Sequence, residues 1–538
     1  MAEARGRKCR RVPASVWLGC TAAFVVALGL RLWGIGFGLP DLYHPDEPAY
    51  VLQALAVGRG LPDGLTFANP PLYKYLLLAE YAVDYGVGRL SGSTHSAQAF
   101  VDQFRVDPSR LYLIARVTSA VFGALTAIAA YALGSTVGGR RVGLIAALLT
   151  AITYLLARDA HFGVNDALVT LLATLGLVFC VRVAQGGPRG DYFMAGTLAG
   201  LAFAAKYHGI ALLAPLVLAH VSRSAPRRAR DLALAVGACL AAAVVGFPSL
   251  VTESGRVLQD VYLHLYLAAV GGYDGLDPAG GYVFYARTLV TGLGWLLLAA
   301  SVAGVVLSIR RRDWSSIVVV SLPAVLLAVL GAQQLYFARF LLPALPALLV
   351  EAALALETLA GVRPAAGLAA ALLVGAPSLV DTLRFDVLLS REDTRTLARS
   401  WIESNLPPLA IVTVDSAPLG PSLSSQRSRQ VLVANEWSLF DLTADDYRAR
   451  GVEYVVASSF TSEVRAVDPT REARRQAFYA ALPREASVTA QFRPYPGDQP
   501  PPFVYDQIYA PFNALDQLER PGPTITVYRL NARAGTPP

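Results

Sequence analysis

Two adjacent carboxylates are the residues of this sequence best placed to do chemistry. Asp46 and Glu47 stand between Pro45 and Pro48, shortly after the first long apolar segment. Adjacent ionised carboxylates repel each other and cost free energy unless they hold a proton, a metal ion or a substrate. Helix capping is an alternative role for Asp46, but it leaves Glu47 unexplained. The pair therefore predicts chemistry at a membrane surface.

Further ionisable residues are expected at the same membrane face. They lie next to predicted helix ends on the outer side: Lys74, Arg116, Arg158, Asp159, His161, Asp166, Lys206, His208, His264 and Arg339. Such residues in a helical membrane protein usually face a cavity, so we expect a wet cavity, open to the outside, that binds something negatively charged. Three alternatives stay open. Lys74 and Arg158 could reach lipid headgroups. The histidines His161, His208 and His264 could be hydrogen-bonded residues of the interface, and Arg116 could pair with an internal carboxylate to fix helix packing.

The composition is that of a membrane protein. The chain is 54% hydrophobic and 16% charged, which excludes an ordinary soluble globule. Apolar stretches that could each span a bilayer recur from Ala14 to about Asp381 and then stop. We therefore predict a membrane domain over 1–381 and a soluble α/β domain over 382–538. The net charge of +7 does not indicate nucleic-acid binding, because the Arg residues form short clusters between apolar stretches.

The apolar pattern predicts about eleven transmembrane helices. The expected spans are 14–36, 111–137, 142–157, 167–184, 192–205, 209–221, 232–250, 287–309, 315–332, 341–359 and 365–381. With the N-terminus in the cytoplasm, every Arg cluster falls inside, as the positive-inside rule requires. This topology predicts a multi-pass protein of the plasma (inner) membrane with its C-terminal domain outside. The first segment lacks a small-residue cleavage site, so we expect a helix rather than a signal peptide.

Two features of the membrane domain are irregular. Spans 192–205 and 209–221 are short and meet at Lys206-Tyr207-His208-Gly209, which favours a break lining a wet cavity over one long tilted helix. The first external loop, 38–110, is too long for a turn. It carries two helical patterns, Pro48–Val57 and Pro71–Gly88, that we expect to lie along the interface.

The C-terminal domain is expected to mix short strands and helices. The predicted helices are Asp393–Asn405 and Thr443–Arg450, and the predicted strands are Ile411–Asp415, Gln430–Ala434, Glu453–Ala457 and Thr524–Leu530. The sequence contains no P-loop, GxGxxG or HExxH motif, so it gives no support to nucleotide-dependent or zinc-protease chemistry.

Several segments in a fixed order resemble a known superfamily. They are Asp46-Glu47, Asn69-Pro70-Pro71-Leu72-Tyr73, Arg158-Asp159-Ala160-His161-Phe162 with Asn165-Asp166, Gly200-Leu201-Ala202 before Lys206-Tyr207, and Tyr336-Phe337-Ala338-Arg339-Phe340 before Pro343 and Pro346. Over about residues 30–380 the chain resembles the GT-C superfamily of membrane glycosyltransferases. It resembles in particular the bacterial relatives of protein O-mannosyltransferases and of the aminoarabinose transferases of lipid A (glycosyltransferase families 39 and 83).

The resemblance implies a reaction as well as a fold. Such enzymes take a sugar from a polyprenyl-phosphate donor and transfer it, usually with inversion, on the outer face of the membrane. The acceptor is a hydroxyl of a protein, a lipid or a glycan. The expected partners are therefore this lipid-linked donor, the acceptor and the bilayer, with no nucleic acid.

The candidate residues can be assigned roles in that reaction. Asp46 is the candidate base for the acceptor proton, and Glu47 would orient a substrate or tune the pKa of Asp46. Cations must stabilise the departing phosphate, and the candidates, in order, are Lys206, Arg339, Arg158 and Arg116. The substrate-binding candidates are His161, Asp166, Lys74, Tyr336 and Asn69.

The sequence departs from the superfamily pattern at one place. Ala68 and Asn69 stand where aminoarabinose transferases have an acid and a lysine that contact metal and phosphate. No cofactor is therefore assigned, and a divalent metal would have Asp46 and Glu47 as its candidate ligands.

Two other functions compete with glycosyl transfer. The first is a transporter or flippase of a lipid-linked or anionic substrate, but transporters place their sites near the midplane between sequence repeats, whereas no repeat is visible here. The second is a membrane scaffold whose external domain binds a partner. A scaffold would leave the pair Asp46-Glu47 unexplained.

Overall fold

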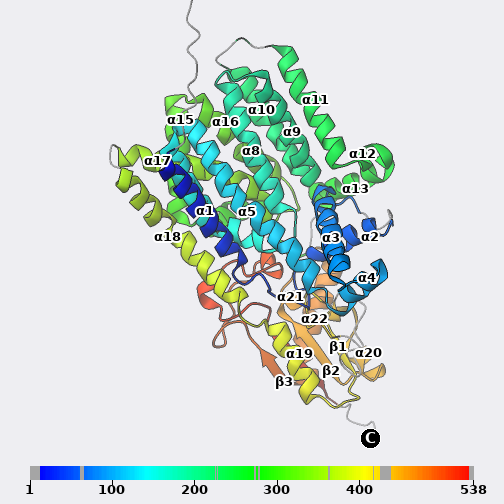
Figure 1. Cartoon of the computed structure of the whole chain (residues 1–538). Helices are drawn as coiled ribbons and strands as arrows, with labels where there is room; N and C mark the ends of the chain where they lie inside the picture. Colours follow the sequence, from blue (N-terminus) through cyan, green and yellow to red (C-terminus); the bar gives the residue numbers. More distant parts are fainter. Residues whose placement is uncertain are drawn as a thin grey trace, which may run out of the picture.

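The structure is a computed structural model that describes residues 13–60, 66–223, 226, 228–271, 274–276, 279–361, 364–415, 417–423 and 438–531. It consists of a long bundle of helices followed by a small sheet with its own helices (Figure 1). The strand predicted over 430–434 lies outside the described residues.

The regular elements that the structure describes up to Leu389 are all helices. The α-helices are α1 (Ala14–Leu32), α2 (Glu47–Gly58), α3 (Leu72–Ser91), α4 (Ala97–Val106), α5 (Ser109–Gly138), α6 (Arg140–Ile152), α7 (Tyr154–Arg158), α8 (Asp166–Ala184), α9 (Arg189–Ala205), α10 (Leu213–Ser222), α11 (Ala229–Gly246), α12 (Ser249–Thr252), α13 (Ser254–Tyr266), α14 (Gly281–Leu293), α15 (Trp295–Arg311), α16 (Trp314–Gly331), α17 (Leu345–Ala360) and α18 (Pro364–Leu389). Shorter 3-10 turns, η2 (Asp159–His161), η3 (Tyr207–Leu212) and η5 (Ala338–Ala344), join α7 to α8, α9 to α10 and α16 to α17.

The helix lengths agree with the predicted membrane domain. Within the described residues seven helices are long and apolar enough to cross a bilayer, or nine if the bent pairs α6–α7 and α14–α15 each make one span. The predicted pair 192–205 and 209–221 accounts for the two others, because α9 has only 17 residues and η3–α10 is shorter still. The predicted fold class, a multi-pass helical membrane protein with a small C-terminal sheet, is confirmed.

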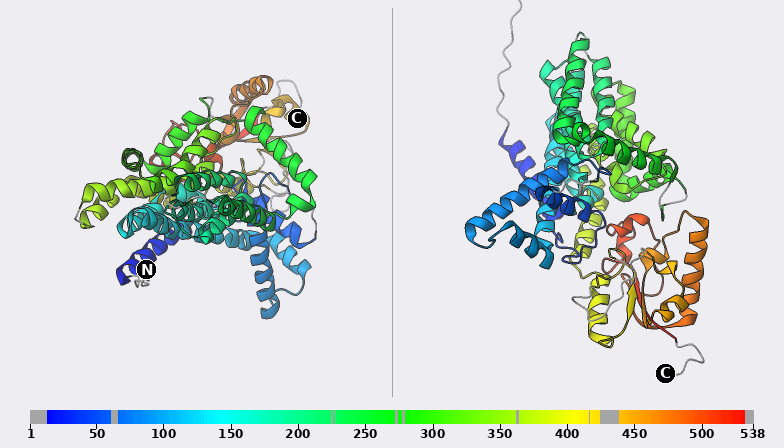
Figure 2. Two further views of the ribbon diagram at one scale, coloured as in Figure 1. Left: turned by 90° about the horizontal axis from the view of Figure 1, so that it is seen from above. Right: turned by 90° about the vertical axis from the view of Figure 1, so that its right-hand side faces the viewer.

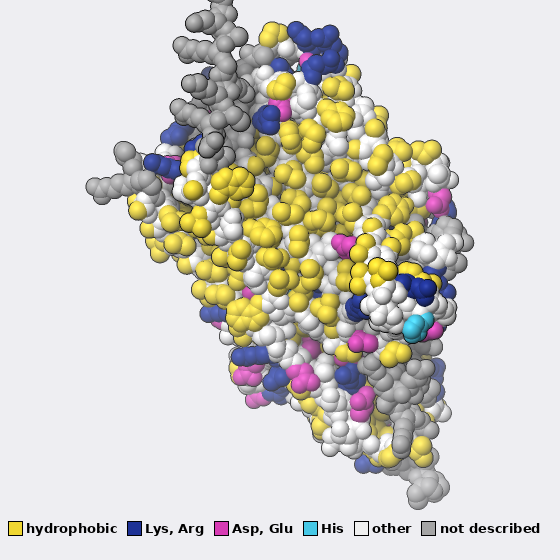
Figure 3. All heavy atoms as spheres, in the orientation of Figure 1, with side chains coloured by type: hydrophobic (Ala, Val, Ile, Leu, Met, Phe, Trp, Pro, Cys, Tyr) yellow, Lys and Arg dark blue, Asp and Glu magenta, His cyan; other side chains and the backbone are white. Residues whose placement is uncertain are grey.

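The surface of the helical part suits a lipid environment. A broad belt of apolar side chains covers the face in view, and charged side chains lie on either side of it, with Lys and Arg mixed with Asp and Glu at the sheet end (Figure 3). Exposed aliphatic side chains such as Leu240, Val245 and Leu373 lie on α11 and α18. Because each helix satisfies its own backbone hydrogen bonds, only its side chains need to match the hydrocarbon.

The predicted break between 205 and 209 is confirmed. Lys206 has extended backbone angles (φ −158°, ψ 135°), so α9 ends before it and η3 starts after it. Glycine is required at 209 because a Cβ there would collide with the carbonyl group of Ala202. The residues of the break do not continue one helix, and Lys206 and His208 among them line a cavity.

The C-terminal part contains a four-stranded sheet in the order β1-β2-β4-β3. Its strands are β1 (Val412–Val414), β2 (Tyr454–Ser458), β3 (Ala486–Phe492) and β4 (Ile525–Leu530), with β1 parallel to β2 and the other pairs antiparallel. Around it lie α19 (Thr394–Asn405), α20 (Ala444–Ala449), α21 (Ser459–Ser462) and α22 (Pro469–Glu485), with 3-10 turns η6 (Leu439–Asp441), η7 (Tyr505–Ile508) and η8 (Leu515–Gln517).

Most of the predicted C-terminal elements are present. The three predicted strands that lie in described residues correspond to β1, β2 and β4, and the two predicted helices correspond to α19 and α20. The pattern missed α22 and the edge strand β3, whose side chains are mostly exposed and therefore show no apolar alternation. α18 continues to Leu389, beyond the boundary at 381, which stays a prediction.

Candidate active site

A cavity of about 510 Å³ lies where the break after α9 meets the start of α2, the helix α13 and the turn η5. Its polar lining consists of Asp46, Tyr50, Asn69, Lys206, Tyr207, His208, His264, Gln333 and Arg339. Its apolar wall includes side chains of η3 and α16, among them Ile210, Val325 and Val329. This volume falls in the ordinary range for small-ligand sites.

The carboxylate of Asp46 faces Arg339 across this cavity. Oδ2 of Asp46 lies 3.0 Å from Nη2 of Arg339, and the Asp46 side chain is 33% exposed. The side chain makes no capping hydrogen bond to α2, although Asp46 directly precedes that helix. The backbone N–H of Asp46 donates instead to Nδ1 of His44 at 3.3 Å. The acid is thus available to a ligand while its backbone is held.

The ammonium group of Lys206 is paired with Asp166, the first residue of α8. The distance from Nζ to Oδ1 is 2.5 Å, and both side chains are almost fully buried. The ammonium group also lies 4.9 Å from the centre of the Phe340 ring. Lys206 lines the cavity but Asp166 does not, so the Asp166 carboxylate binds the ammonium group from outside the cavity.

The guanidinium group of Arg339 packs against aromatic rings. Its guanidinium carbon is 4.3 Å from the ring centre of Phe337 and 4.1 Å from that of Tyr509, a residue of the C-terminal part. A guanidinium group stacks on aromatic faces while its N–H groups stay free in its own plane. The arrangement leaves Arg339 able to donate to Asp46 or to an anion in the cavity.

Glu47 lies away from this cavity although it is the neighbour of Asp46 in sequence. Its two carboxylate oxygens each accept from Arg116 at 2.7 Å, and one also accepts from the backbone of Gly163 at 2.7 Å. Both side chains of the pair are fully buried. Arg116 in addition donates to the carbonyl groups of Ile35 and Phe37. The internal pairing proposed as an alternative for Arg116 is therefore the one observed.

Arg158 also points elsewhere. Its guanidinium donates to Asp159 at 2.9 Å and to the backbone carbonyl groups of Asp506, Ala510 and Pro511 at 2.8, 3.1 and 3.1 Å. It is buried and does not line the cavity. Its contacts join the membrane part to the C-terminal part.

Lys74 supports the cavity indirectly. Its ammonium group donates to the backbone carbonyl groups of Thr66 at 2.9 Å and Asn69 at 3.1 Å. The same loop is held from the other side by Asp260, which accepts from the backbone of Phe67 at 2.7 Å. Burial lowers the pKa of Lys74 to about 7. Lys74 thus shapes the loop that brings Asn69 to the cavity.

The two remaining predicted residues lie outside the cavity lining. His161 is buried, with Nδ1 2.8 Å from the carbonyl oxygen of Ala157 and Nε2 3.1 Å from that of Trp33. Tyr336 is buried with its ring centre 5.1 Å from that of Phe284. The structure therefore gathers Asp46, Lys206, Arg339 and Asn69 at one cavity and places the other candidates around it.

Three lining or adjoining residues were not predicted. Tyr50 lines the cavity and its hydroxyl donates to Asn165 at 2.9 Å, Gln333 lies at the end of α16, and Tyr509 comes from the C-terminal part. Helical spacing from Asp46 could have suggested Tyr50, which lies one turn further along α2. No sequence pattern indicates that Tyr509 would reach Arg339.

The donor set does not fit a bound divalent cation in this arrangement. Among the described residues there is no group of three or more His, Cys, Asp or Glu side chains placed to hold a metal ion. The two candidate ligands diverge, because Asp46 faces Arg339 and Glu47 is bound by Arg116. Two arginines at the carboxylates compete with a metal ion for them.

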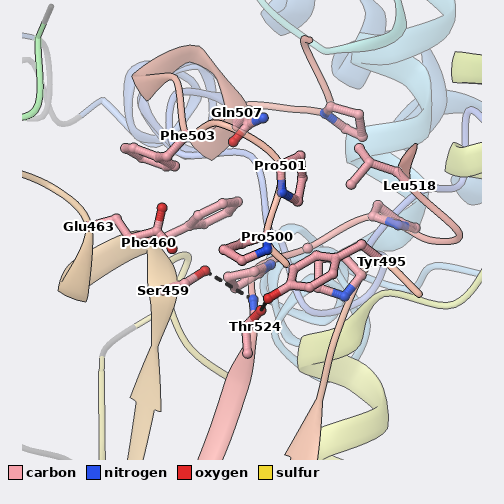
Figure 4. Close-up of a pocket in the computed structure, with 15 residues that line it drawn as sticks. Ser459, Phe460, Glu463, Tyr495, Pro500, Pro501, Phe503, Gln507, Leu518 and Thr524 are labelled. Carbon is pink, nitrogen blue, oxygen red and sulfur yellow. Dashed lines mark hydrogen bonds between the residues drawn. The ribbon is translucent and has the colours of Figure 1, made fainter. Parts of the chain in front are cut away.

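A second pocket lies in the C-terminal part and differs in kind. It holds only about 40 Å³ and is bordered by Pro500, Pro501, Phe460, Phe503 and Tyr495 (Figure 4). This is far below the few hundred Å³ of an ordinary ligand site. We therefore place the candidate active site at the larger cavity.

Comparison with known proteins finds a matching family model and solved structures with a similar fold. The family model of dolichyl-phosphate-mannose-protein mannosyltransferases matches residues 112–251. This stretch contains Lys206 but neither Asp46 nor Arg339. No curated protein sequence matches the chain.

Solved structures share the fold at low sequence identity. ArnT from Cupriavidus metallidurans in the apo state is 15% identical, with a TM-score of 0.53 over 88% of this chain and 96% of that chain. ArnT from the same organism bound to undecaprenyl phosphate is also 15% identical, with a TM-score of 0.51 over 98% of this chain and 100% of that chain. The oligosaccharyltransferase of Archaeoglobus fulgidus in the apo form is 14% identical, with a TM-score of 0.52 over 82% of this chain and 69% of that chain. The family match over residues 112–251 and this shared fold confirm the predicted resemblance to the GT-C superfamily of membrane glycosyltransferases.

Proposed function

We propose that this protein transfers a sugar from a polyprenyl-phosphate donor to an acceptor hydroxyl, with inversion, and that Asp46 is the general base. One observation carries the proposal: a single cavity of about 510 Å³ holds an acid, two cations and an apolar wall. The reaction needs these three features together, since it combines proton removal, a phosphate leaving group and a lipid tail.

Arg339 and Lys206 bind the donor phosphate. Without donor, their charges are balanced by Asp46 and Asp166. The donor phosphate competes with Asp46 for Arg339, because charge-assisted hydrogen bonds from a guanidinium to phosphate are strong and bidentate. Negative charge on the phosphate grows as its bond to the sugar breaks, so these cations bind the transition state more tightly than the donor.

Asp46 becomes free to act as base once the phosphate has engaged Arg339. The acceptor oxygen attacks the anomeric carbon from the face opposite the phosphate, which gives inversion. The bond from carbon to the phosphate oxygen breaks, its electron pair leaves with the phosphate, and the acceptor proton passes to Asp46. Asn69 is placed to hold a hydroxyl of the sugar or acceptor. None of these steps is routed through a metal ion.

The apolar wall accommodates the lipid. Ile210 of η3 and Val325 and Val329 of α16 line the same cavity as the charged residues. Apolar side chains suit a prenyl chain because they have no hydrogen bonds to lose. ArnT, which shares this fold, was solved with undecaprenyl phosphate, and this supports a polyprenyl-phosphate donor here.

The other predicted residues have supporting roles in this proposal. Glu47 and Arg116 fix the start of α2 and thereby orient Asp46, while Arg158 binds the C-terminal part. Asp166 positions Lys206, Lys74 positions the loop of Asn69, and His161 and Tyr336 pack behind the site.

The topology in the cell is part of the proposal. The sheet lies at one end of the molecule, beyond the apolar belt, and the Arg clusters at 140–141 and 310–312 lie at the junctions of α5 with α6 and of α15 with α16 (Figures 1 and 3). The positive-inside rule then favours a plasma (inner) membrane protein with its N-terminus in the cytoplasm and the catalytic face outside. We place the catalytic membrane domain at 1–381 and the extracytoplasmic domain at 382–538.

The experiment that tests the function is a transfer assay. Radiolabelled sugars on a small panel of polyprenyl phosphates are incubated with membranes that hold the wild type or Asp46→Asn. We expect label in a protein, lipid or glycan fraction with one donor and none with the variant. Movement of donor across vesicles without any transfer would instead favour the transporter or flippase.

A further inference from the structure

The C-terminal part inserts one segment into the helical part beside the candidate active site. Residues 505–512 follow a proline-rich loop and lie between the sheet and the helices (Figures 1 and 2). Ala510, Phe512 and Leu515 belong to the same buried apolar cluster as the membrane helices. The two parts of the chain therefore share one core at this place.

Buried polar contacts hold the backbone of the segment. The guanidinium of Arg158 donates to the carbonyl groups of Asp506, Ala510 and Pro511. The hydroxyl of Tyr154 donates to the carbonyl group of Pro511 at 2.9 Å. Such buried donors cost free energy if they lose their partners. The segment therefore has one favoured position against the helices of the membrane part.

Side chains of the segment reach the residues around Arg339. Oδ1 of Asp506 accepts from the backbone N–H of Ala338 at 3.0 Å, directly before Arg339. The ring of Tyr509 lies 4.1 Å from the guanidinium carbon of Arg339 and 5.8 Å from the ring of Phe337, which also contacts that guanidinium. Tyr509 is 8% exposed. Its ring packs against one side of the Arg339 guanidinium group.

We propose that Tyr509 is a positioning residue of the transfer site. Its ring holds the guanidinium of Arg339 so that the N–H donors point toward Asp46 and the cavity, where the donor phosphate binds. The active site is then complete only when the C-terminal segment is docked. The inference rests on the proposed function, in which Arg339 binds the phosphate.

The stacking explains why the residue should matter for turnover. An arginine side chain has several rotatable bonds and would sample many positions in a wet cavity. A misplacement of about 1 Å of a positioned group can cost about 100-fold in rate. The rings of Tyr509 and Phe337 pack against the guanidinium group of Arg339, so they exclude most of these side-chain positions before the donor binds.

The first test compares three variants for sugar transfer. We expect Tyr509→Leu to lower kcat by about 10- to 100-fold, with a smaller change in KM for the donor. Tyr509→Phe keeps the ring and should recover most of that loss. Phe503→Leu is the matched control, since this aromatic residue of the same loop borders the small proline-walled pocket (Figure 4). Wild-type kcat in Tyr509→Leu would overturn the proposal.

The second test separates positioning from a general structural role. In the background of Arg339→Gln, Tyr509→Leu should lower transfer by less than about twofold further, because coupled residues do not add. A general loss of structure would lower transfer by the same factor in both backgrounds and would overturn the proposal.

A binding readout keeps the inference distinct from the proposed function. Undecaprenyl phosphate should raise the Tm of the purified wild type and of Phe503→Leu more than that of Tyr509→Leu. If the wild type transfers no sugar but this difference persists, the proposed reaction fails and the role of Tyr509 stands. An equal rise in Tm for all three proteins would overturn the role of Tyr509.

Discussion

The carboxylate of Asp46 lies 3.0 Å from the guanidinium of Arg339, a residue that follows it by 293 positions. The contact joins the proposed base to a proposed phosphate ligand in one ion pair. Because each group neutralises the other, neither is left as an isolated charge in a largely apolar cavity. A donor phosphate that takes over Arg339 also releases the base, so donor binding and activation of Asp46 are coupled.

The first prediction concerns Asp46. Asp46→Asn removes the proton acceptor and keeps the size of the side chain, so transfer should fall by about 100- to 10,000-fold. The measurement is label transfer per amount of folded protein, with folding checked by size-exclusion chromatography. Asp102→Asn on the exposed helix α4 is the matched control and should leave transfer unchanged. Transfer by Asp46→Asn at the rate of this control would disprove the role of Asp46.

The second prediction concerns the buried pair of Lys206 and Asp166. Lys206→Met leaves the Asp166 carboxylate without its partner, and breaking a buried ion pair costs about 3–5 kcal/mol. Transfer should fall by about 100-fold or more because a cation at the phosphate is lost. Thermal unfolding in detergent measures the first effect and the transfer assay the second.

The double variant Lys206→Met/Asp166→Asn separates the two effects. It removes both charges together, so it should regain most of the lost stability and none of the lost transfer. Recovery of transfer along with stability would show that Lys206 serves only the fold.

The third prediction contrasts Glu47 with its neighbour. Glu47→Gln leaves Arg116 buried without a counter-charge and should lower the free energy of unfolding by about 3 kcal/mol or more. Transfer per folded molecule should change far less than in Asp46→Asn, because Glu47 does not line the cavity. A stable Glu47→Gln protein without any transfer would instead place Glu47 in the chemistry.

The fourth prediction concerns the pH dependence that Lys74 contributes. Its pKa is about 7 in the folded protein against 10.5 normally, so the unfolded chain binds more protons between these values. The free energy of unfolding therefore gains a contribution that rises with pH from about 7 to about 10.5. The Tm of the wild type minus that of Lys74→Met should increase from pH 6 to pH 9.5. A constant difference would show that Lys74 has an ordinary pKa.

The fold class could be predicted because its signals are local. Apolar length identified the long helices, and Gly209 marked the break after α9. Strands β1, β2 and β4 were found from their β-branched residues. The edge strand β3 and helix α22 were missed, since exposed elements show little apolar periodicity.

The sequence by itself determined which residue types would meet at one end of the helices. It identified Asp46, Lys206 and Arg339 as candidates, because an ionisable residue near a helix end has few stable positions in a membrane. Only the tertiary structure decided which carboxylate each cation faces. Glu47 forms an ion pair with Arg116, and Tyr509 of the C-terminal part packs against Arg339. Pairing at such separations depends on how helices and sheet pack together, and no local pattern of residues encodes it.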